Sequence, residues 1–280
     1  MLTEAQRAAL TARLRQRRPV GAAPPAPVVP FGTHGPAAAF AVHAIGGSVH
    51  EYAPLARALD GACAVSGIEA AGLREGTSPV TELATMAVRY ADTVRTVQPS
   101  GPYRLLGWSM GGVLAYETAR RLEADGGEVA LVVLVDAPYR AIRSYASSPE
   151  GLAALFVSEV LGRASPRPAA AALPSVAQQL ADLTARLAPE PAERIALAAD
   201  LDRRYAVFVA HVAALAGYTP DGPVDAAAVL VTAHGSPDAA PDWRRLFRGG
   251  ARVSASAADH HGCLRPPAVD GIAAAVRAAL

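Results

Sequence analysis

The sequence predicts an α/β fold built on a mostly parallel sheet that is flanked by helices. Apolar stretches of strand length alternate with amphipathic stretches of helix length along most of the chain, which is the pattern of strand–helix–strand units. The 280 residues are 51% hydrophobic and 18% charged, so they supply a large core and exclude a disordered or fibrous chain. One long helical insertion interrupts the alternation between two core strands.

The first half of the expected sheet comes from short apolar runs, each followed by a helix. Ala38–His43 is a strand that leads into the glycine-containing loop 44–47, and the next helix is expected over Tyr52–Leu59. Ala62–Ile68 is the second strand, and a long amphipathic helix over Val80–Val97 follows it. A helix after each strand carries the chain back across the sheet, so neighbouring strands are expected to run parallel.

The remaining elements repeat this alternation. Tyr103–Gly107 is a strand, and Leu131–Asp136 is a continuous apolar run expected to be buried on both faces of the sheet. A helix over Gly111–Asp125 joins these two strands. The last expected elements are two strands and a C-terminal helix: Ala227–Thr232, Val253–Ala257 and Val269–Leu280.

The chain before the sheet is expected to be a helix and a linker. Residues 3–17 read as a helix that Thr3 can cap, with Leu10 and Leu14 on one face. Residues 19–30 are rich in proline and are predicted to be an irregular linker. Residues 1–30 are therefore set apart, and the globular domain is predicted to span residues 31–280.

A helical insertion is expected at about residues 140–216. This stretch is rich in Ala and Pro and is helical by pattern, and it is too long for a loop in a compact sheet. In an α/β fold the carboxyl ends of the strands carry the functional site. An insertion between core strands at that end is placed to act as a lid.

Charge and composition limit the kinds of partner and ligand that this chain is expected to bind. The formal net charge is +1, from 26 basic and 25 acidic residues, so no nucleic-acid partner is expected. The chain has two cysteines, no Walker or dinucleotide-binding loop and no cluster of metal ligands, so no metal or bound cofactor is expected. No apolar run has the length of a secretory signal or a membrane span, which predicts a cytoplasmic protein without a membrane partner.

The strongest local motif is the sequence Gly107-Trp108-Ser109-Met110-Gly111. It matches G-x-S-x-G between a strand and a helix, which is typical of the nucleophile turn in the α/β-hydrolase fold. Side chains at positions 107 and 111 would crowd such a sharp turn, so glycine is needed there. The hydroxyl of Ser109 would project from the sheet at the N-terminus of a helix, where the helix dipole favours negative charge. Ser109 is therefore the candidate nucleophile.

A serine nucleophile needs a base and an acid that orients the base, in the chain order Ser, Asp or Glu, His. Asp136 ends one buried strand and Asp238 follows a later one, and each is placed to aim a carboxylate at a histidine. The general hydrolase pattern favours Asp238. Only His260 and His261 follow both acids, and His260 is the preferred base. The other histidines are interpreted as surface or structural residues.

An oxyanion hole requires two backbone donors. One is the N–H of Met110, directly after the nucleophile. The other is expected in the loop after the first long strand, at Ile45 or, less favoured, at Ala44. Glycines in this loop allow a substrate to approach the backbone closely.

Five stretches of the chain point to a family: AFAVHAIGGSVHEYAPLARAL, GPYRLLGWSMGGVLAYETARRL, LVVLVDAP, AGYTP and ADHHGCLRPP. Through them the region from Phe31 to Leu280 resembles the type I thioesterase domains that end nonribosomal peptide synthetase and polyketide synthase assembly lines. The resemblance implies that Ser109 accepts the acyl group and that the acid is Asp136, in LVDAP. It places the base at His260, although Ala258 stands where the family has glycine. It assigns the oxyanion role to the backbone N–H groups of Ile45 and Met110.

The resemblance also implies a function. The chain would release an acyl or peptidyl chain from the phosphopantetheine thioester of a carrier protein, by hydrolysis or macrocyclisation, in natural-product biosynthesis. No cofactor would be bound. Apart from the resemblance, the pattern of the N-terminal helix leaves two interpretations open: a solvated terminal helix, which is preferred, or a helix that docks onto a synthase subunit. Three alternatives stay open: a stand-alone editing (type II) thioesterase, an ordinary esterase or acyltransferase that uses a small ester, and a catalytically silent interaction protein. Editing enzymes more often carry His in place of Trp108, and a silent scaffold would not need every triad position filled.

Overall fold

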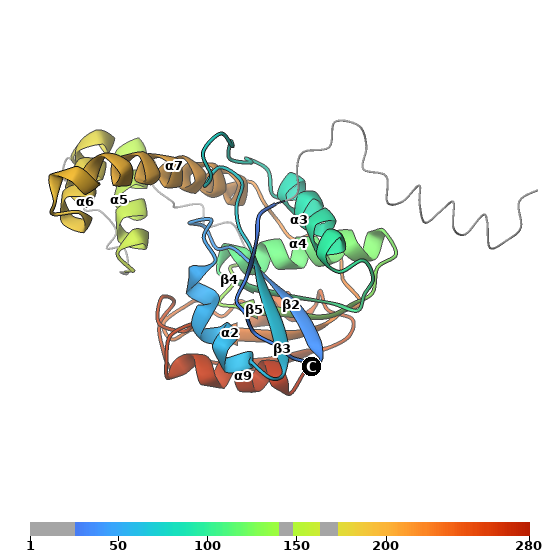
Figure 1. Cartoon of the computed structure of the whole chain (residues 1–280). Coiled ribbons are helices and arrows are strands. Elements are labelled where there is room, and N and C mark those ends of the chain that lie inside the picture. Colours follow the sequence, from blue (N-terminus) through green and yellow to red (C-terminus); the bar gives the residue numbers. More distant parts are fainter. Residues whose placement is uncertain (1–25, 140–147, 163–172) are drawn as a thin grey trace, which may run out of the picture.

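The computed structural model describes residues 26–139, 148–162 and 173–280 (Figure 1). The helix expected over residues 3–17 lies outside the described residues, as do parts of the insertion. None of the helices in the described ranges combines the length and the apolar character that crossing a membrane requires.

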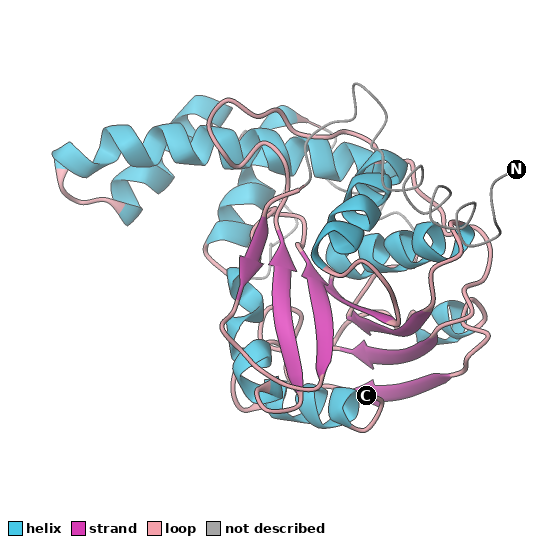
Figure 2. Cartoon of the chain, turned by 45° about the vertical axis from the view of Figure 1, so that its right-hand side comes forward, coloured by secondary structure: helices cyan, strands magenta, loops and turns pink. Residues whose placement is uncertain are grey.

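Within the described ranges, seven strands form one sheet in the order β1-β3-β2-β4-β5-β6-β7 (Figure 2). All neighbouring strands are parallel except β1, which runs antiparallel to β3. The predicted mostly parallel sheet is confirmed. The strands are β1 (Val28–Pro30), β2 (Ala37–Val42), β3 (Cys63–Ile68), β4 (Tyr103–Trp108), β5 (Val129–Val135), β6 (Ala227–Thr232) and β7 (Ala251–Ala255).

Helices cover both faces of the sheet. The helices are η1 (His50–Tyr52, a 3-10 helix), α2 (Ala53–Leu59), α3 (Leu83–Val97), α4 (Met110–Ala124), α5 (Pro149–Val160), α6 (Val176–Leu187), α7 (Pro191–Ala216), α8 (Ala240–Arg244) and α9 (Ala268–Arg277). Helices α2 and α9 pack together on one face, and α3 and α4 pack together on the other (Figure 1). Strand β2 serves both layers, because Phe40 and Val42 join the α3/α4 core while Ala39 and Ala41 join the α2/α9 core.

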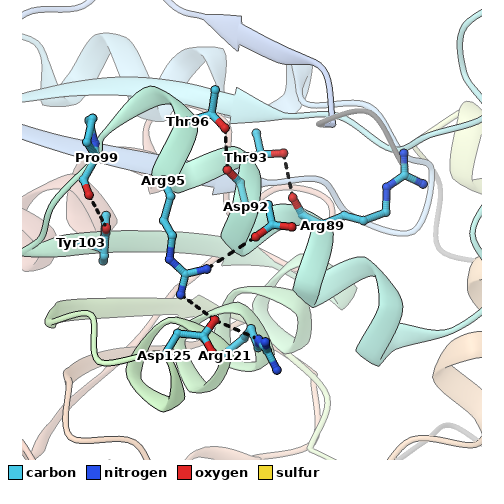
Figure 3. A network of polar contacts seen from close by, with 9 residues as sticks. All are labelled: Arg89, Asp92, Thr93, Arg95, Thr96, Pro99, Tyr103, Arg121 and Asp125. Carbon is cyan, nitrogen blue, oxygen red and sulfur yellow. Dashed lines mark hydrogen bonds and ion pairs between the residues drawn. The ribbon is translucent and has the colours of Figure 1, made fainter. Parts of the chain in front are cut away.

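Polar contacts join α3 to the far end of α4, away from the turn that carries Ser109 (Figure 3). The guanidinium of Arg95 contacts Asp125 at 2.8 Å and Asp92 at 3.6 Å, and Arg121 reaches Asp125 at 3.1 Å. These side chains are partly exposed, so each pair contributes at most about 1 kcal/mol. Their main effect is to compensate the negative charge of Asp125 at the C-terminal end of α4, where the helix dipole disfavours it.

The first strand corrects one prediction. Residues 19–30 are predicted to be an irregular linker, and this is wrong for Val28–Pro30, which pair with β3. The globular part also begins before Phe31, because Ala26 is buried and its N–H donates to Thr93 Oγ1 at 2.9 Å. Proline is compatible with β1 because β1 is an edge strand with a partner on one side only.

The helices of the insertion project beyond the sheet (Figures 1 and 2). We refer to α5, α6 and α7, which fall within the stretch predicted to be a lid, as the lid helices. Helix α6 packs against α5 and α7, and α5 packs against the middle of α7, where Phe156 contacts Tyr205 and Phe208. The last part of α7 returns to the core, where Val207, Phe208 and His211 are buried. The insertion is therefore anchored through the C-terminal part of its longest helix.

Candidate active site

Ser109 lies in a strained turn between β4 and α4. Its φ is 55° and its ψ is −130°, a conformation that residues other than glycine rarely adopt. A Cβ atom at position 107 would lie 2.0 Å from the Gly111 carbonyl oxygen, and one at position 111 would lie 2.4 Å from the Val42 carbonyl oxygen. Both glycines are therefore required by close backbone contacts. The Ser109 N–H donates to the Val135 carbonyl at 2.9 Å, which sets the turn beside the end of β5.

The side chain of a buried tyrosine is hydrogen-bonded to this turn. The Tyr52 hydroxyl accepts a hydrogen bond from the Trp108 N–H at 2.6 Å and donates to the Val42 carbonyl at 2.7 Å. Burial raises the pKa of Tyr52, so the hydroxyl stays protonated and can donate. One side chain thus joins the ends of β2 and β4, the two strands that lead into the candidate oxyanion loop and the nucleophile turn.

Replacing Tyr52 with Phe is expected to lower the free energy of unfolding by about 1–3 kcal/mol, because it leaves buried polar groups without the hydroxyl. Urea denaturation measures this loss. Tyr103→Phe is the matched control, since its ring is also buried but its hydroxyl donates to Pro99 only over 3.5 Å. Equal losses in the two variants would show that the hydroxyl of Tyr52 has no special structural role.

Asp136 follows β5 and also has a positive φ, 47°. This conformation turns its carboxylate into a set of hydrogen bonds at the carboxyl end of the sheet. Oδ2 accepts from His260 Nδ1 at 2.6 Å and from Ser236 Oγ at 2.7 Å, and Oδ1 accepts from the Ala233 N–H at 3.0 Å. Burial acts to raise the pKa of Asp136, but these hydrogen bonds outweigh it and hold the pKa below its ordinary value. Asp136 is therefore a carboxylate at neutral pH.

The competing acid has a different surrounding. Oδ1 of Asp238 accepts from the Ala240 N–H at 3.1 Å and from Thr232 Oγ1 at 3.3 Å. These bonds stabilise the turn into the short helix α8. The structure thus brings Asp136, and not Asp238, to the imidazole of His260.

His260 lies against Trp108, the residue before Ser109. The two ring centroids are 4.9 Å apart, and Trp108 Nε1–H donates to the His260 carbonyl at 3.0 Å. His261 lies edge-on to His260 at 5.2 Å, and burial together with the nearby His260 lowers its pKa. In the described residues His260 is hydrogen-bonded to Asp136 but not to Ser109. Catalytic hydrogen bonds are often long in free enzymes and shorten when substrate binds.

The two predicted oxyanion donors come from the start of α4 and from the loop after β2. Met110 is the first residue of α4, where backbone N–H groups have no partner within the helix. Ile45 is buried in the loop after β2, which closes through a bond from the Gly47 N–H to the Ala44 carbonyl at 3.0 Å. Gly47 has a φ of 82°, and a Cβ atom there would come within 2.9 Å of Val207 on α7.

Two histidines form a buried pair beside this loop; sequence reasoning interpreted each of them singly, as a surface or structural residue, and did not predict the pairing. His43, after β2, and His211, on α7, are 0% and 1% exposed, and their rings stack at 4.8 Å with an interplanar angle of 11°. Burial, and then the mutual charge, lowers the pKa of His43 to about 3, while burial lowers that of His211 to about 4. The two residues lie far apart in the sequence, and no local pattern links them.

The buried pair predicts a pH dependence of stability. Both folded pKa values lie below the ordinary value of 6.5, so between pH 6.5 and about 4 the unfolded chain binds protons that the folded chain does not. Stability is complete above this window and falls with pH inside it, by up to about 1.4 kcal/mol per pH unit for each histidine. Asp136 does not contribute to the pH dependence of stability in this window, because the stability that its lowered pKa provides is lost only below pH 3.8.

Urea denaturation between pH 7 and pH 5 measures this slope. His211→Asn is expected to reduce it, while His34→Asn, at an exposed imidazole, serves as control. A slope that is unchanged in His211→Asn would contradict the prediction.

A cavity of about 360 Å³ lies beside Trp108 and His261. Its far wall is the end of α5 and the residues after it, 159–162. Burial raises the pKa of Glu159 in this wall. No group of three or more His, Cys, Asp or Glu side chains that could hold a metal ion occurs in the described part of the chain.

Comparisons with known proteins identify the family of this chain. The family model "Thioesterase domain" matches residues 38–280. Malpinin synthetase of Mortierella alpina is 40% identical over 112 residues, which are 40% of this chain and 1% of that protein. Polyketide synthase PksR of Bacillus subtilis (strain 168) is 40% identical over 74 residues, which are 26% of this chain and 3% of that protein. The chain therefore corresponds to a small part of the length of these relatives.

The fold has solved counterparts. The wild-type structure of the Vlm2 thioesterase domain superposes with a TM-score of 0.66 at 22% identity, covering 90% of this chain and 97% of that one. This likeness shows the shared fold, and the predicted α/β-hydrolase fold is confirmed. The strained serine turn and the Asp136–His260 pair lie within the region that the family model matches. The chain therefore belongs to the thioesterase domain family, of the type found in nonribosomal peptide and polyketide synthases.

Proposed function

We propose that the chain is a serine thioesterase that releases an acyl or peptidyl chain from the phosphopantetheine thioester of a carrier protein, by hydrolysis or macrocyclisation. The observation that carries the proposal is the 2.6 Å contact between Asp136 and His260, next to the strained turn of Ser109. A carboxylate accepts only, so it holds the His260 proton on Nδ1 and leaves Nε2 as the base. Hydrolase activity follows from the family, and the roles of Ser109, Asp136 and His260 are inferred from their positions.

The first half of the reaction acylates the serine. His260 Nε2 takes the proton as Ser109 Oγ forms a bond to the thioester carbonyl carbon. The N–H groups of Met110 and Ile45 stabilise the oxyanion of the tetrahedral intermediate. The intermediate collapses with cleavage of the carbon–sulfur bond, and the proton from His260 passes to the departing sulfur. A free pantetheine thiol and an acyl-serine ester result.

The second half releases the product. His260 removes a proton from water, or from an amine or hydroxyl of the bound chain itself, as that group attacks the ester carbonyl. The bond to Ser109 Oγ breaks, and the oxygen regains the proton from His260. Water gives a free acid and an internal nucleophile gives a ring. The cavity beside Trp108 is the space in which we place the acyl chain.

The proposal names one protein partner, the carrier protein that presents the thioester. The reaction needs no bound cofactor, since the phosphopantetheine arm belongs to the carrier and the triad supplies the proton transfers. Docking of the N-terminal helix onto a synthase subunit remains a separate proposal, because residues 1–25 lie outside the described part of the chain.

Intact mass spectrometry tests the proposal. The protein is mixed with acyl-pantetheine thioesters and acylated carrier proteins, and the Ser109→Ala variant is the control. We expect a mass gain of one acyl group that depends on Ser109, followed by release of an acid or a ring. Rapid clearing of many short acyl groups would favour an editing enzyme, and preference for soluble esters would favour an ordinary esterase. Thiol release that persists in Ser109→Ala would overturn the serine mechanism.

A further inference from the structure

The buried histidine pair connects a lid helix to the candidate oxyanion loop. His211 belongs to α7, and its Nδ1 lies 2.8 Å from the carbonyl oxygen of Ile45. His43 stands at the start of the loop, and its Nδ1 lies 2.7 Å from the carbonyl oxygen of Ala44. The imidazole rings of His43 and His211 stack on each other. Two successive carbonyl groups of the loop are thus each bound by an imidazole, and the Ala44 carbonyl also accepts from the Gly47 N–H at 3.0 Å.

The hydrogen bonds determine where the protons lie. A carbonyl oxygen only accepts, so Nδ1 of each ring must carry the hydrogen. Nε2 of neutral His43 is then an acceptor, and it lies 2.5 Å from the hydroxyl of Tyr90, which donates. Burial keeps both rings neutral at neutral pH. The arrangement therefore has one consistent set of donors and acceptors.

Peptide geometry carries this order to the predicted donor. The Ala44 carbonyl and the Ile45 N–H belong to one planar trans peptide unit and point in opposite directions. Holding that carbonyl therefore sets the direction of the Ile45 N–H. His211 holds the next carbonyl, so the peptide units on both sides of the Ile45 Cα are fixed and its two dihedral angles are fixed with them.

Side-chain packing supports the same connection independently of the hydrogen bonds. Gly47 ends the turn of the loop. A Cβ atom at this position would lie 2.9 Å from Val207 Cγ1 on α7, so the backbone of Gly47 packs closely against this side chain. Val207 is fully buried, one helical turn before His211. Helix α7 thus meets the loop at two points on the same face.

We propose that His211 is a positioning residue through which the lid helix α7 sets the oxyanion loop, by donating from Nδ1 to the Ile45 carbonyl while its ring stacks on His43. The inference rests on the proposed serine mechanism, since it assigns the Ile45 N–H to the oxyanion. The histidine does not touch substrate and transfers no proton. Its effect is to hold a donor in place, so that loop geometry depends on the position of α7.

Three variants separate the hydrogen bond from the stack. His211→Leu removes both, and His211→Phe keeps an aromatic ring but removes the donor. His211→Asn keeps a donor where Nδ1 lies, because the asparagine amide nitrogen occupies the equivalent position, and loses the ring. Ile195→Ala, on the exposed face of the same helix, is the matched control. Thermal denaturation verifies that each variant is folded.

Phosphonylation of Ser109 by an alkyl fluorophosphonate is the readout, because its transition state places charge in the same hole and no natural substrate is needed. The maximal labelling rate is expected to fall about tenfold to a hundredfold in His211→Leu and His211→Phe, with the half-saturating concentration unchanged. His211→Asn and Ile195→Ala are expected to label like the unmodified chain. Amide hydrogen exchange over residues 44–47 should accelerate only in the Leu and Phe variants.

The outcomes distinguish the two levels of inference. Unaltered labelling in His211→Phe, or slow labelling in His211→Asn, would overturn the role of the hydrogen bond. Labelling with the expected order of rates, but no thiol release from any acyl carrier, would support the positioning role and overturn the carrier-thioester function. An unmodified chain that is not labelled at Ser109 would overturn both. If the Leu variant does not fold, the Phe and Asn pair decides.

Discussion

Replacing Ser109 with Ala is expected to lower kcat for thioester release by about 10⁴-fold or more, because the reaction loses its covalent intermediate. The small side chain removes Oγ and leaves the turn itself unchanged, including the bond from the residue 109 N–H to the Val135 carbonyl. The midpoint of thermal unfolding is therefore expected to stay close to that of the unmodified chain.

Thiol release from an acyl carrier, recorded with a thiol-reactive dye, measures this loss. Ser100→Ala, at an exposed position at the opposite end of β4, is the matched control and is expected to keep full activity. Comparable rates in the Ser109→Ala and Ser100→Ala proteins would mean that another group performs the attack. A drop in activity with a large drop in the unfolding midpoint would instead indicate damage to the fold.

Replacing Asp136 with Asn is expected to lower kcat by about 10⁴-fold, because an amide in place of the carboxylate no longer holds the His260 proton on Nδ1. The amide nitrogen can donate to Nδ1, which favours the tautomer with its hydrogen on Nε2 and removes the base. The change also replaces a charge that accepts three hydrogen bonds, from His260, Ser236 and the Ala233 N–H.

Asp238→Asn is the paired variant for this prediction. In the part of the chain that the structure describes, Asp238 accepts bonds from Thr232 at the end of β6 and from the Ala240 N–H, and an asparagine oxygen can accept the same bonds. Its activity is expected to be little changed. The assignment of the acid fails if Asp238→Asn cripples the rate while Asp136→Asn leaves it intact.

Sequence reasoning located β2, β5 and β6 because each is a short, dense apolar run, which is typical of a buried strand. Leu131–Asp136 is the clearest case, and its observed counterpart is Val129–Val135. The first strand was missed because three residues, one of them a proline, carry too little pattern. Val28–Pro30 becomes a strand through its pairing with β3, which is a tertiary effect.

Some residues of the candidate site could be predicted from the sequence and others could not. The glycines at positions 107 and 111 predict the turn around Ser109, because a side chain at either position would clash with nearby backbone atoms. The choice between Asp136 and Asp238 has no local signal, because each follows a strand and can accept hydrogen bonds. It depends on where His260 lies after folding, and so on packing against Trp108. The His43–His211 stack depends on two distant segments meeting and was beyond any periodicity argument.

Helix α7 has the mechanical properties of a rigid rod clamped at one end. Its C-terminal part is fixed in the core from Val207 onward, and α5 packs beside that part, against Tyr205 and Phe208, while the part that begins at Pro191 follows directly on α6. From Pro191 to Val207 the rod is about 24 Å long, so a tilt of about 10° at the clamp displaces its free end by about 4 Å. A tilt too small to disturb the buried end can therefore move the N-terminal end of α7 by about the diameter of a hydrocarbon chain's methylene group.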